Sequence, residues 1–155
     1  MSDFSLTRSL RIAASPEQIR PWIDDFHRWS DWSPWHGLDP NMTVTYNGPQ
    51  SGEGAQQSWC GNKEAGEGSM RVLHSSEHRV DVELTFIKPF AATNHVRFDL
   101  VPIGADATEV RWTMTGQHTV LMRVFYTVFR MEKKLAADFD RGLAALKRSV
   151  ETAAA

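Results

Sequence analysis

The feature that most constrains the fold is a series of alternating segments followed by one long amphipathic stretch. Between residues 42 and 114, apolar side chains recur at every second position in short runs separated by turn residues. The clearest runs are 80–86, 96–100 and 110–114, where charged residues and threonines occupy the positions between the apolar ones. Alternation of this kind predicts half-buried β-strands. Short turns between the strands predict an antiparallel sheet with one apolar face.

A helix is predicted from about 122 to 152, where apolar residues recur at helical spacing along one stripe. Gly142 lies within that stripe, although glycine inside a helix costs about 1 kcal/mol relative to alanine. We therefore expect a close backbone approach at Gly142, or space for another group. The apolar sheet face has to be buried, and this helix is the only predicted element long enough to cover it.

The N-terminal part predicts a strand and two short helical segments. Apolar residues alternate from 4 to 12, and the sequence Ser-Pro-Glu-Gln at 15–18 is typical of a capped helix start. Pro21 conflicts with a continuous helix because it removes one backbone hydrogen bond. We expect a short or kinked helix and then a second one near 27–31.

Together these elements predict an α+β fold in which a curved, seven-stranded antiparallel sheet wraps around the C-terminal helix. Two short helices follow the first strand. No linker, repeat or low-complexity segment divides the sequence, so we expect residues 1–155 to form a single domain.

Composition gives no reason to propose several classes of partner. The 155 residues include 17 Lys and Arg against 19 Asp and Glu, so no basic surface for nucleic acid is predicted. No apolar run reaches the roughly 20 residues that span a bilayer, which argues against stable membrane insertion. Cys60 is the only cysteine, which excludes an intrachain disulfide, and the first residues do not resemble a signal peptide. We expect a cytoplasmic protein, and the sequence does not indicate its oligomeric state.

Several local motifs occur in an order that is informative. They are IAASPE at 12–17, WSDWSPW at 29–35, GEG at 52–54, WCGN at 59–62, GEGSM at 66–70, FIKPF at 86–90, TEVRW at 108–112 and FDRGL at 139–143. With the order of elements, they resemble the START-like (SRPBCC) superfamily in its polyketide cyclase/dehydrase-type branch. The resemblance implies the helix-grip fold and a cavity for small hydrophobic molecules. It implies no particular reaction, no catalytic residues and no cofactor.

The leading hypothesis is therefore a protein that binds a small lipid-, isoprenoid- or polyketide-like molecule between the sheet and the last helix. Candidate polar contacts with the ligand are His74, Asn94 and Gln57. His74 is assigned to the inner face because it lies an even number of residues from Met70 and Val72 along the predicted strand. The candidate apolar wall consists of Trp35, Trp59, Met70, Val72, Phe86, Phe98, Trp112, Met114, Phe125, Phe129 and Phe139.

Two features could suggest other sites. His74 and His78 are four residues apart, but four residues of a strand span about 13 Å, so we predict no metal site. Four tryptophans lie between 22 and 35. We expect Trp22 and Trp29 in the core, whereas Trp32 and Trp35 suit a loop at a cavity mouth.

Two alternatives remain open. The first is a cyclase, aromatase or dehydratase in which an inward His74 moves protons. The second is a protein-interaction or co-chaperone module that uses the outer sheet face or the apolar segment 120–129, which could also be a gate or an ordinary helix start.

Overall fold

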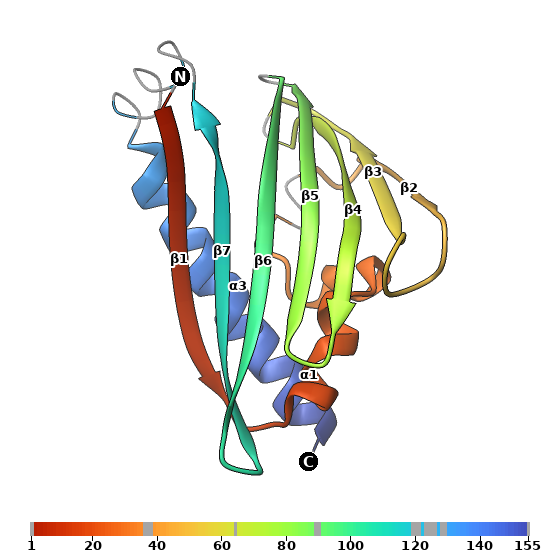
Figure 1. Ribbon diagram of the computed structural model, residues 1–155. Coiled ribbons are helices and arrows are strands. Elements are labelled where there is room, and N and C mark those ends of the chain that lie inside the picture. The colour runs from red at the N-terminus through yellow and green to blue at the C-terminus, as the bar shows by residue number, and fades with distance from the viewer. Residues whose placement is uncertain are drawn as a thin grey trace.

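The computed structural model describes residues 2–35, 39–63, 65–88, 91–118, 122, 127 and 130–154. Seven antiparallel strands form one sheet in the order β1-β7-β6-β5-β4-β3-β2 (Figure 1). Their bounds are β1 Ser2–Ile12, β2 Thr43–Asn47, β3 Gln56–Cys60, β4 Glu67–Ser76, β5 Arg79–Lys88, β6 Ala92–Ile103 and β7 Ala107–His118. The predicted helix-grip fold is confirmed.

The two short helices after β1 form as the sequence predicts, with one difference. Helix α1 (Pro16–Ile23) begins with a capping box between Ser15 and Gln18, and it contains Pro21 without ending there. The second segment is a 3₁₀ helix, η1 (Phe26–Asp31), whose first turn is capped by the Asp25 side chain. Both segments bury apolar side chains at one end of the core.

Helix α3 (Met131–Ala154) crosses the inner face of the sheet, behind the strands in Figure 1. The centre of the contact is the Trp112 ring, stacked 4.1 Å from Phe139 of α3 and 5.1 Å from Phe98 of β6. All three side chains are buried. Stacked and edge-on rings add to the free energy gained by burying apolar area, so this cluster fixes α3 on the sheet. Within the described part, no helix is long and apolar enough to cross a membrane.

Gly142 lies where α3 comes closest to the aromatic cluster. A Cβ atom at this position would be 2.9 Å from Pro34 Cδ and 2.9 Å from Trp112 Cζ3. Real Cβ atoms do not approach other heavy atoms so closely, and the ring of Trp112 is held by its own neighbours. The helical glycine is therefore explained by close backbone approach.

Asp24 connects the short helices to the sheet. Its carboxylate accepts a hydrogen bond from Ser75 Oγ of β4 at 2.9 Å, and its carbonyl oxygen accepts one from the Gly52 backbone at 3.0 Å. Asp24 is 8% exposed. Burial raises the pKa of Asp24 above its usual value, and this effect outweighs the hydrogen bond from Ser75 and the charges of Arg20 and Arg28.

We expect the substitution Gly142→Ala to destabilise the protein, although alanine is the better helix former. Overpacking a filled core typically costs about 1–3 kcal/mol, whereas the alanine contributes about 1 kcal/mol in helix propensity. Urea unfolding of the two proteins measures the difference. The reverse change at an exposed position of the same helix, Ala137→Gly, reports the propensity effect alone. A Gly142→Ala protein more stable than the wild type would contradict the close approach.

We expect Asp24→Asn to increase the free energy of unfolding at neutral pH. A carboxyl whose pKa is raised by folding binds its proton more tightly in the folded state, so ionised Asp24 reduces stability above that pKa. The gain should shrink as the pH falls from neutral toward the ordinary carboxyl range, where wild-type Asp24 becomes protonated. Urea unfolding at several pH values tests this, with exposed Asp106→Asn as the control. An equal loss of stability at every pH would show that the charge of Asp24 is not the cause.

Candidate ligand-binding cleft

Strands β6 and β7 separate at one end of the sheet. The two strands pair from Ile103–Ala107 as far as His95–Thr115. Beyond that pair, residues 92–94 of β6 and 116–118 of β7 do not pair with each other. There β6 continues along β5 as far as Ala92, while β7 continues along β1 to its end. The ribbon shows the two strands diverging (Figure 1). The sheet is therefore split at this end.

A cleft of about 470 Å³ lies at the split. Its described walls come mainly from the separated ends of β6 and β7, with contributions from β4 and β5. The lining residues are Leu73, Glu83, Ala91, Ala92, Thr93, Asn94, His95, Thr115, Gly116, Gln117 and Met122. The volume is in the range of small-molecule sites, which is about 300–1,000 Å³. Polar side chains line the outer part, and Asn94, Gly116 and Met122 mark the inner part.

Asn94 is the most buried polar side chain of the cleft, with 7% of its surface exposed. Its Nδ2 donates to the sulfur of Met114, at 3.8 Å. Its Oδ1 has no hydrogen-bond partner among the described residues, and a Cβ atom at Gly116 would lie 2.1 Å from it. Glycine at 116 thus leaves the space that the Asn94 amide occupies. Asn94 Oδ1 is not among the fully buried polar atoms without a partner, so it stays accessible to accept a hydrogen bond from the cleft.

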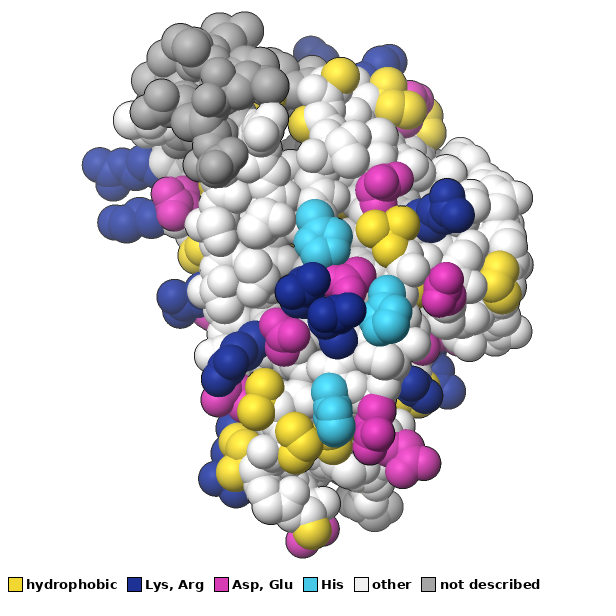
Figure 2. Space-filling view, viewed as in Figure 1, with side chains coloured by type: hydrophobic (Ala, Val, Ile, Leu, Met, Phe, Trp, Pro, Cys, Tyr) yellow, Lys and Arg dark blue, Asp and Glu magenta, His cyan; other side chains and the backbone are white. Residues whose placement is uncertain are grey.

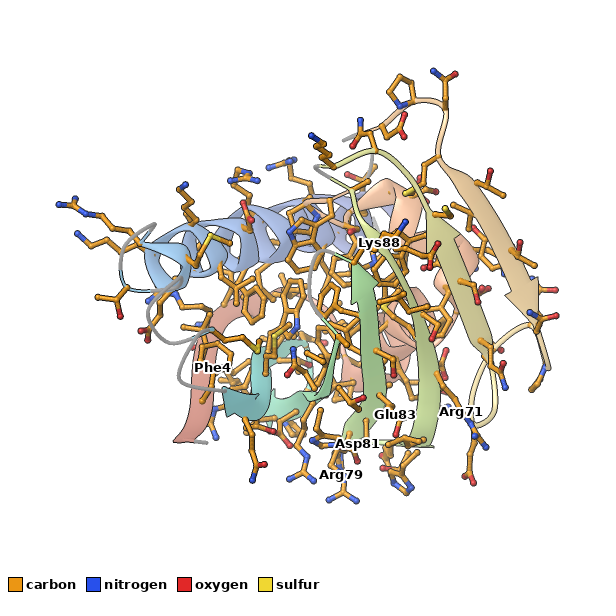
Figure 3. All side chains as sticks on the ribbon, turned by 90° about the horizontal axis from the view of Figure 1, so that it is seen from above. Phe4, Arg71, Arg79, Asp81, Glu83 and Lys88 are labelled. Carbon is orange, nitrogen blue, oxygen red and sulfur yellow. The ribbon has the colours of Figure 1, made fainter. Side chains whose placement is uncertain are left out.

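A charged cluster lies on the outer face of the sheet beside the cleft. Asp81 of β5 is 5% exposed and accepts a hydrogen bond from Arg97 Nε at 2.8 Å. Arg79 Nε is 2.9 Å from Oδ2 of the same carboxylate, and His95 Nε2 is 3.0 Å from Oδ1. Figure 3 shows Arg79, Asp81 and Glu83 on the side of the sheet away from α3. Of these groups, His95 and Glu83 also line the cleft.

The outer face carries both signs of charge, as the sequence predicted. Figure 2 shows acidic, basic and histidine side chains interspersed over this face. Arg111 pairs with Glu109 next to the Asp81 cluster. Such a mixture stabilises the wet side of a sheet through cross-strand pairs and offers no extended basic surface.

The predicted inward orientation of His74 is wrong. A β-bulge between Val72 and His74 shifts the register, so that Val72 still pairs with Val82 while His74 pairs with Asp81. Directly paired residues project from the same face, and Asp81 belongs to the outer face. His74 therefore lies beside the charged cluster, and simple alternation could not reveal the extra residue.

The predicted apolar wall divides into two groups. Val72, Phe98, Trp112 and Phe139 are at most 1% exposed and belong to the packed core, where Trp112 Nε1 has no described hydrogen-bond partner. Contact between these residues and a ligand stays a prediction. The partly buried members are Trp35, Trp59, Met70 and Phe86, all packed against the core cluster.

The remaining members of the predicted site lie in different places. Met114 is buried and contacts Asn94 beneath the cleft. Gln57 of β3 is half-buried and pairs with Met70 of β4, away from the split. Phe125 and Phe129 lie outside the described residues, as does most of the segment 120–129 that we considered as a gate or a partner surface.

The two tryptophans expected near a cavity mouth are placed differently. Trp32 lies in the turn that follows η1, but it is 2% exposed and its Nε1 donates to the Trp22 carbonyl at 2.8 Å, so its ring belongs to the packed core. Trp35 is half-buried, and its Nε1 donates to Asp138 Oδ2 of α3 at 3.2 Å. Among the residues whose positions are described, no cluster of His, Cys, Asp and Glu could hold a metal ion.

Residues 3–151 match the family described as "Polyketide cyclase / dehydrase and lipid transport". The chain belongs to this family. Membership implies binding of a hydrophobic ligand or a cyclase-type activity, and the match covers both the cleft and the core. No curated protein matches the sequence.

Solved structures support the same fold at low sequence identity. A Thermus thermophilus protein is 16% identical, with a TM-score of 0.68 and coverage of 98% of this chain and 100% of the other. A Chromobacterium violaceum protein is 12% identical, with a TM-score of 0.66 and coverage of 95% and 96%. A point mutant of norcoclaurine synthase from Thalictrum, in complex with a transition-state analogue, is 16% identical, with a TM-score of 0.67 and coverage of 99% and 98%. These similarities concern the fold alone.

Proposed function

We propose that this protein binds a small hydrophobic molecule, lipid-, isoprenoid- or polyketide-like, at the cleft between the separated ends of β6 and β7. The observation that carries the proposal is the buried Asn94, whose carbonyl oxygen faces an open cleft without a partner among the described residues. A ligand that donates a hydrogen bond to this oxygen gains about 0.5–1.5 kcal/mol from that bond. Family membership supports a hydrophobic ligand.

The proposed binding mode combines apolar transfer with a few polar contacts. Leu73 and Met122 supply apolar surface in the cleft, and Met114 lies directly under Asn94. Burial of apolar ligand surface stabilises a complex by about 25 cal/mol per Å², and polar groups fix its orientation. Methionine side chains adapt to ligands of different shape because they are unbranched and flexible.

We expect Asn94→Leu to weaken binding of naphthalen-2-ylmethanol, a neutral aromatic alcohol, by about two- to tenfold, the effect of one lost hydrogen bond. Titration followed by NMR measures the affinity, and the largest shifts are expected at the backbone amides of Thr93, Asn94, Thr115 and Gly116. Asn47→Leu, an exposed change on the edge strand β2, is the matched control.

A second variant protects this test against a folding defect in Asn94→Leu. In Gly116→Ala, the new Cβ displaces the Asn94 amide, because its distance to Oδ1 would otherwise be 2.1 Å. Weaker binding is expected here too. If neither variant changed the affinity, or if the shifts mapped to another face, the cleft would not be the binding site.

An acid–base enzyme of the cyclase type is the second candidate, because the cleft carries two ionisable side chains, Glu83 and His95. A neutral imidazole carries one unprotonated nitrogen that can act as a base, and the Nε2 atom of His95 lies 3.0 Å from Asp81. His95 thus takes the role that the sequence predicted for His74.

For this candidate, we expect the protein to accelerate exchange of the α-hydrogens of 2-tetralone for deuterium in D₂O, followed by proton NMR. His95 would remove the proton to leave an enolate, and a deuteron would then be returned to the same carbon. The variant His95→Asn should reduce the rate by about a hundredfold or more, the range attributed to general-base catalysis. His78→Asn, on the turn before β5, is the control. Equal rates for the wild type and His95→Asn would rule out His95 as the base.

A further inference from the structure

We infer that the cleft selects ligands whose polar end is a hydrogen-bond donor that is neutral or positively charged, such as a hydroxyl or an amine, and rejects carboxylates. This inference rests on the proposed function, since it specifies the chemistry of the ligand at the same cleft. It follows from the hydrogen-bonding capacity and the charge of the lining side chains.

The polar atoms left available in the cleft include three acceptors. Asn94 Oδ1 has no described partner, and the Nδ2 of the same amide is turned to the Met114 sulfur. His95 Nε2 lies 3.0 Å from a carboxylate oxygen of Asp81. A neutral imidazole has one ring nitrogen that accepts a hydrogen bond. Glu83 adds a carboxylate.

The charges lining the cleft favour the same class of ligand. Glu83 is the one carboxylate among the described lining residues, which include no lysine or arginine. Arg71 of β4 is the cross-strand neighbour of Glu83, and Arg97 donates to Asp81. A ligand carboxylate would meet Glu83 in the cleft, and it would offer no hydrogen to Asn94. An ammonium group would meet an opposite charge and would supply hydrogens.

The experiment compares four naphthalene probes of nearly equal size: naphthalen-2-ylmethanamine, naphthalen-2-ylmethanol, its methyl ether and 2-naphthoic acid. Affinities are measured by NMR titration of the full chain at neutral pH. We expect the amine and the alcohol to bind about tenfold more tightly than the acid. The ether, which has the shape of the alcohol without its donor, should bind about two- to tenfold more weakly than the alcohol.

The variant Glu83→Gln separates charge from shape. Glu83 is exposed, so the charge effect is moderate, and we expect the amine to lose about two- to fivefold in affinity while the acid gains a similar factor. The alcohol should change little. Glu53→Gln, on the exposed turn before β3 and away from the cleft, is the matched control and should leave all four affinities unchanged.

The outcomes distinguish this inference from the proposed function. Binding of the acid as tightly as the amine and the alcohol, with shifts at Thr93 and Gly116, would overturn the donor preference and leave the cleft as the binding site. Equal affinities for the alcohol and its ether would overturn the role of the Asn94 acceptor. Absence of binding by all four probes, or shifts at other residues, would overturn the proposed function itself.

Discussion

The structure depends on how the single apolar face of the sheet is buried against α3. Trp112 provides the central contact, because its ring is stacked between Phe139 of the helix and Phe98 of the neighbouring strand. The packing is tight enough that the helix carries Gly142 opposite this ring. Polar contacts complete the attachment at the edge of the sheet, where Arg8 of β1 forms two hydrogen bonds of 2.8 Å with Asp140. These contacts hold the helix in one register along β1 and β7.

The sequence predicted most of this arrangement because one face of each strand is buried and the other is exposed to solvent. The alternation of apolar and polar residues therefore indicates which side chains face the core, as for Val80, Val82 and Leu84. The start of α1 was also predictable, since Ser15 and Gln18 form a local capping box that does not depend on tertiary contacts. The unusual glycine in the helical stripe correctly indicated a close approach, although its partners, Pro34 and Trp112, could not be named from the sequence.

The candidate site was less predictable, because it depends on two departures from regular pairing. The bulge before His74 inserts one residue without any glycine or proline to indicate it, and it moves the histidine to the opposite face. The separation of β6 and β7 likewise leaves no local signal, since alternation continues through Asn94. Gly116, a glycine inside the predicted strand, is compatible with such an irregularity but was not interpreted from the sequence. Asn94 was a candidate contact from the sequence, whereas Glu83 and His95 were missed because parity assigns them to the outer face.

The divergence of β6 and β7 has a consequence for how chains with this architecture can vary. The aromatic cluster surrounds the residue pair Phe98–Trp112, where β6 and β7 are still hydrogen-bonded. It does not depend on the residues of the two strands beyond the last pair, His95–Thr115. Opening or closing one further row would therefore lengthen or shorten the gap by about 3.4 Å, the rise of one antiparallel residue, while the hydrophobic centre stays unchanged. Substitutions at a single pair of facing residues in β6 and β7 could thus adapt one fold to ligands of different length.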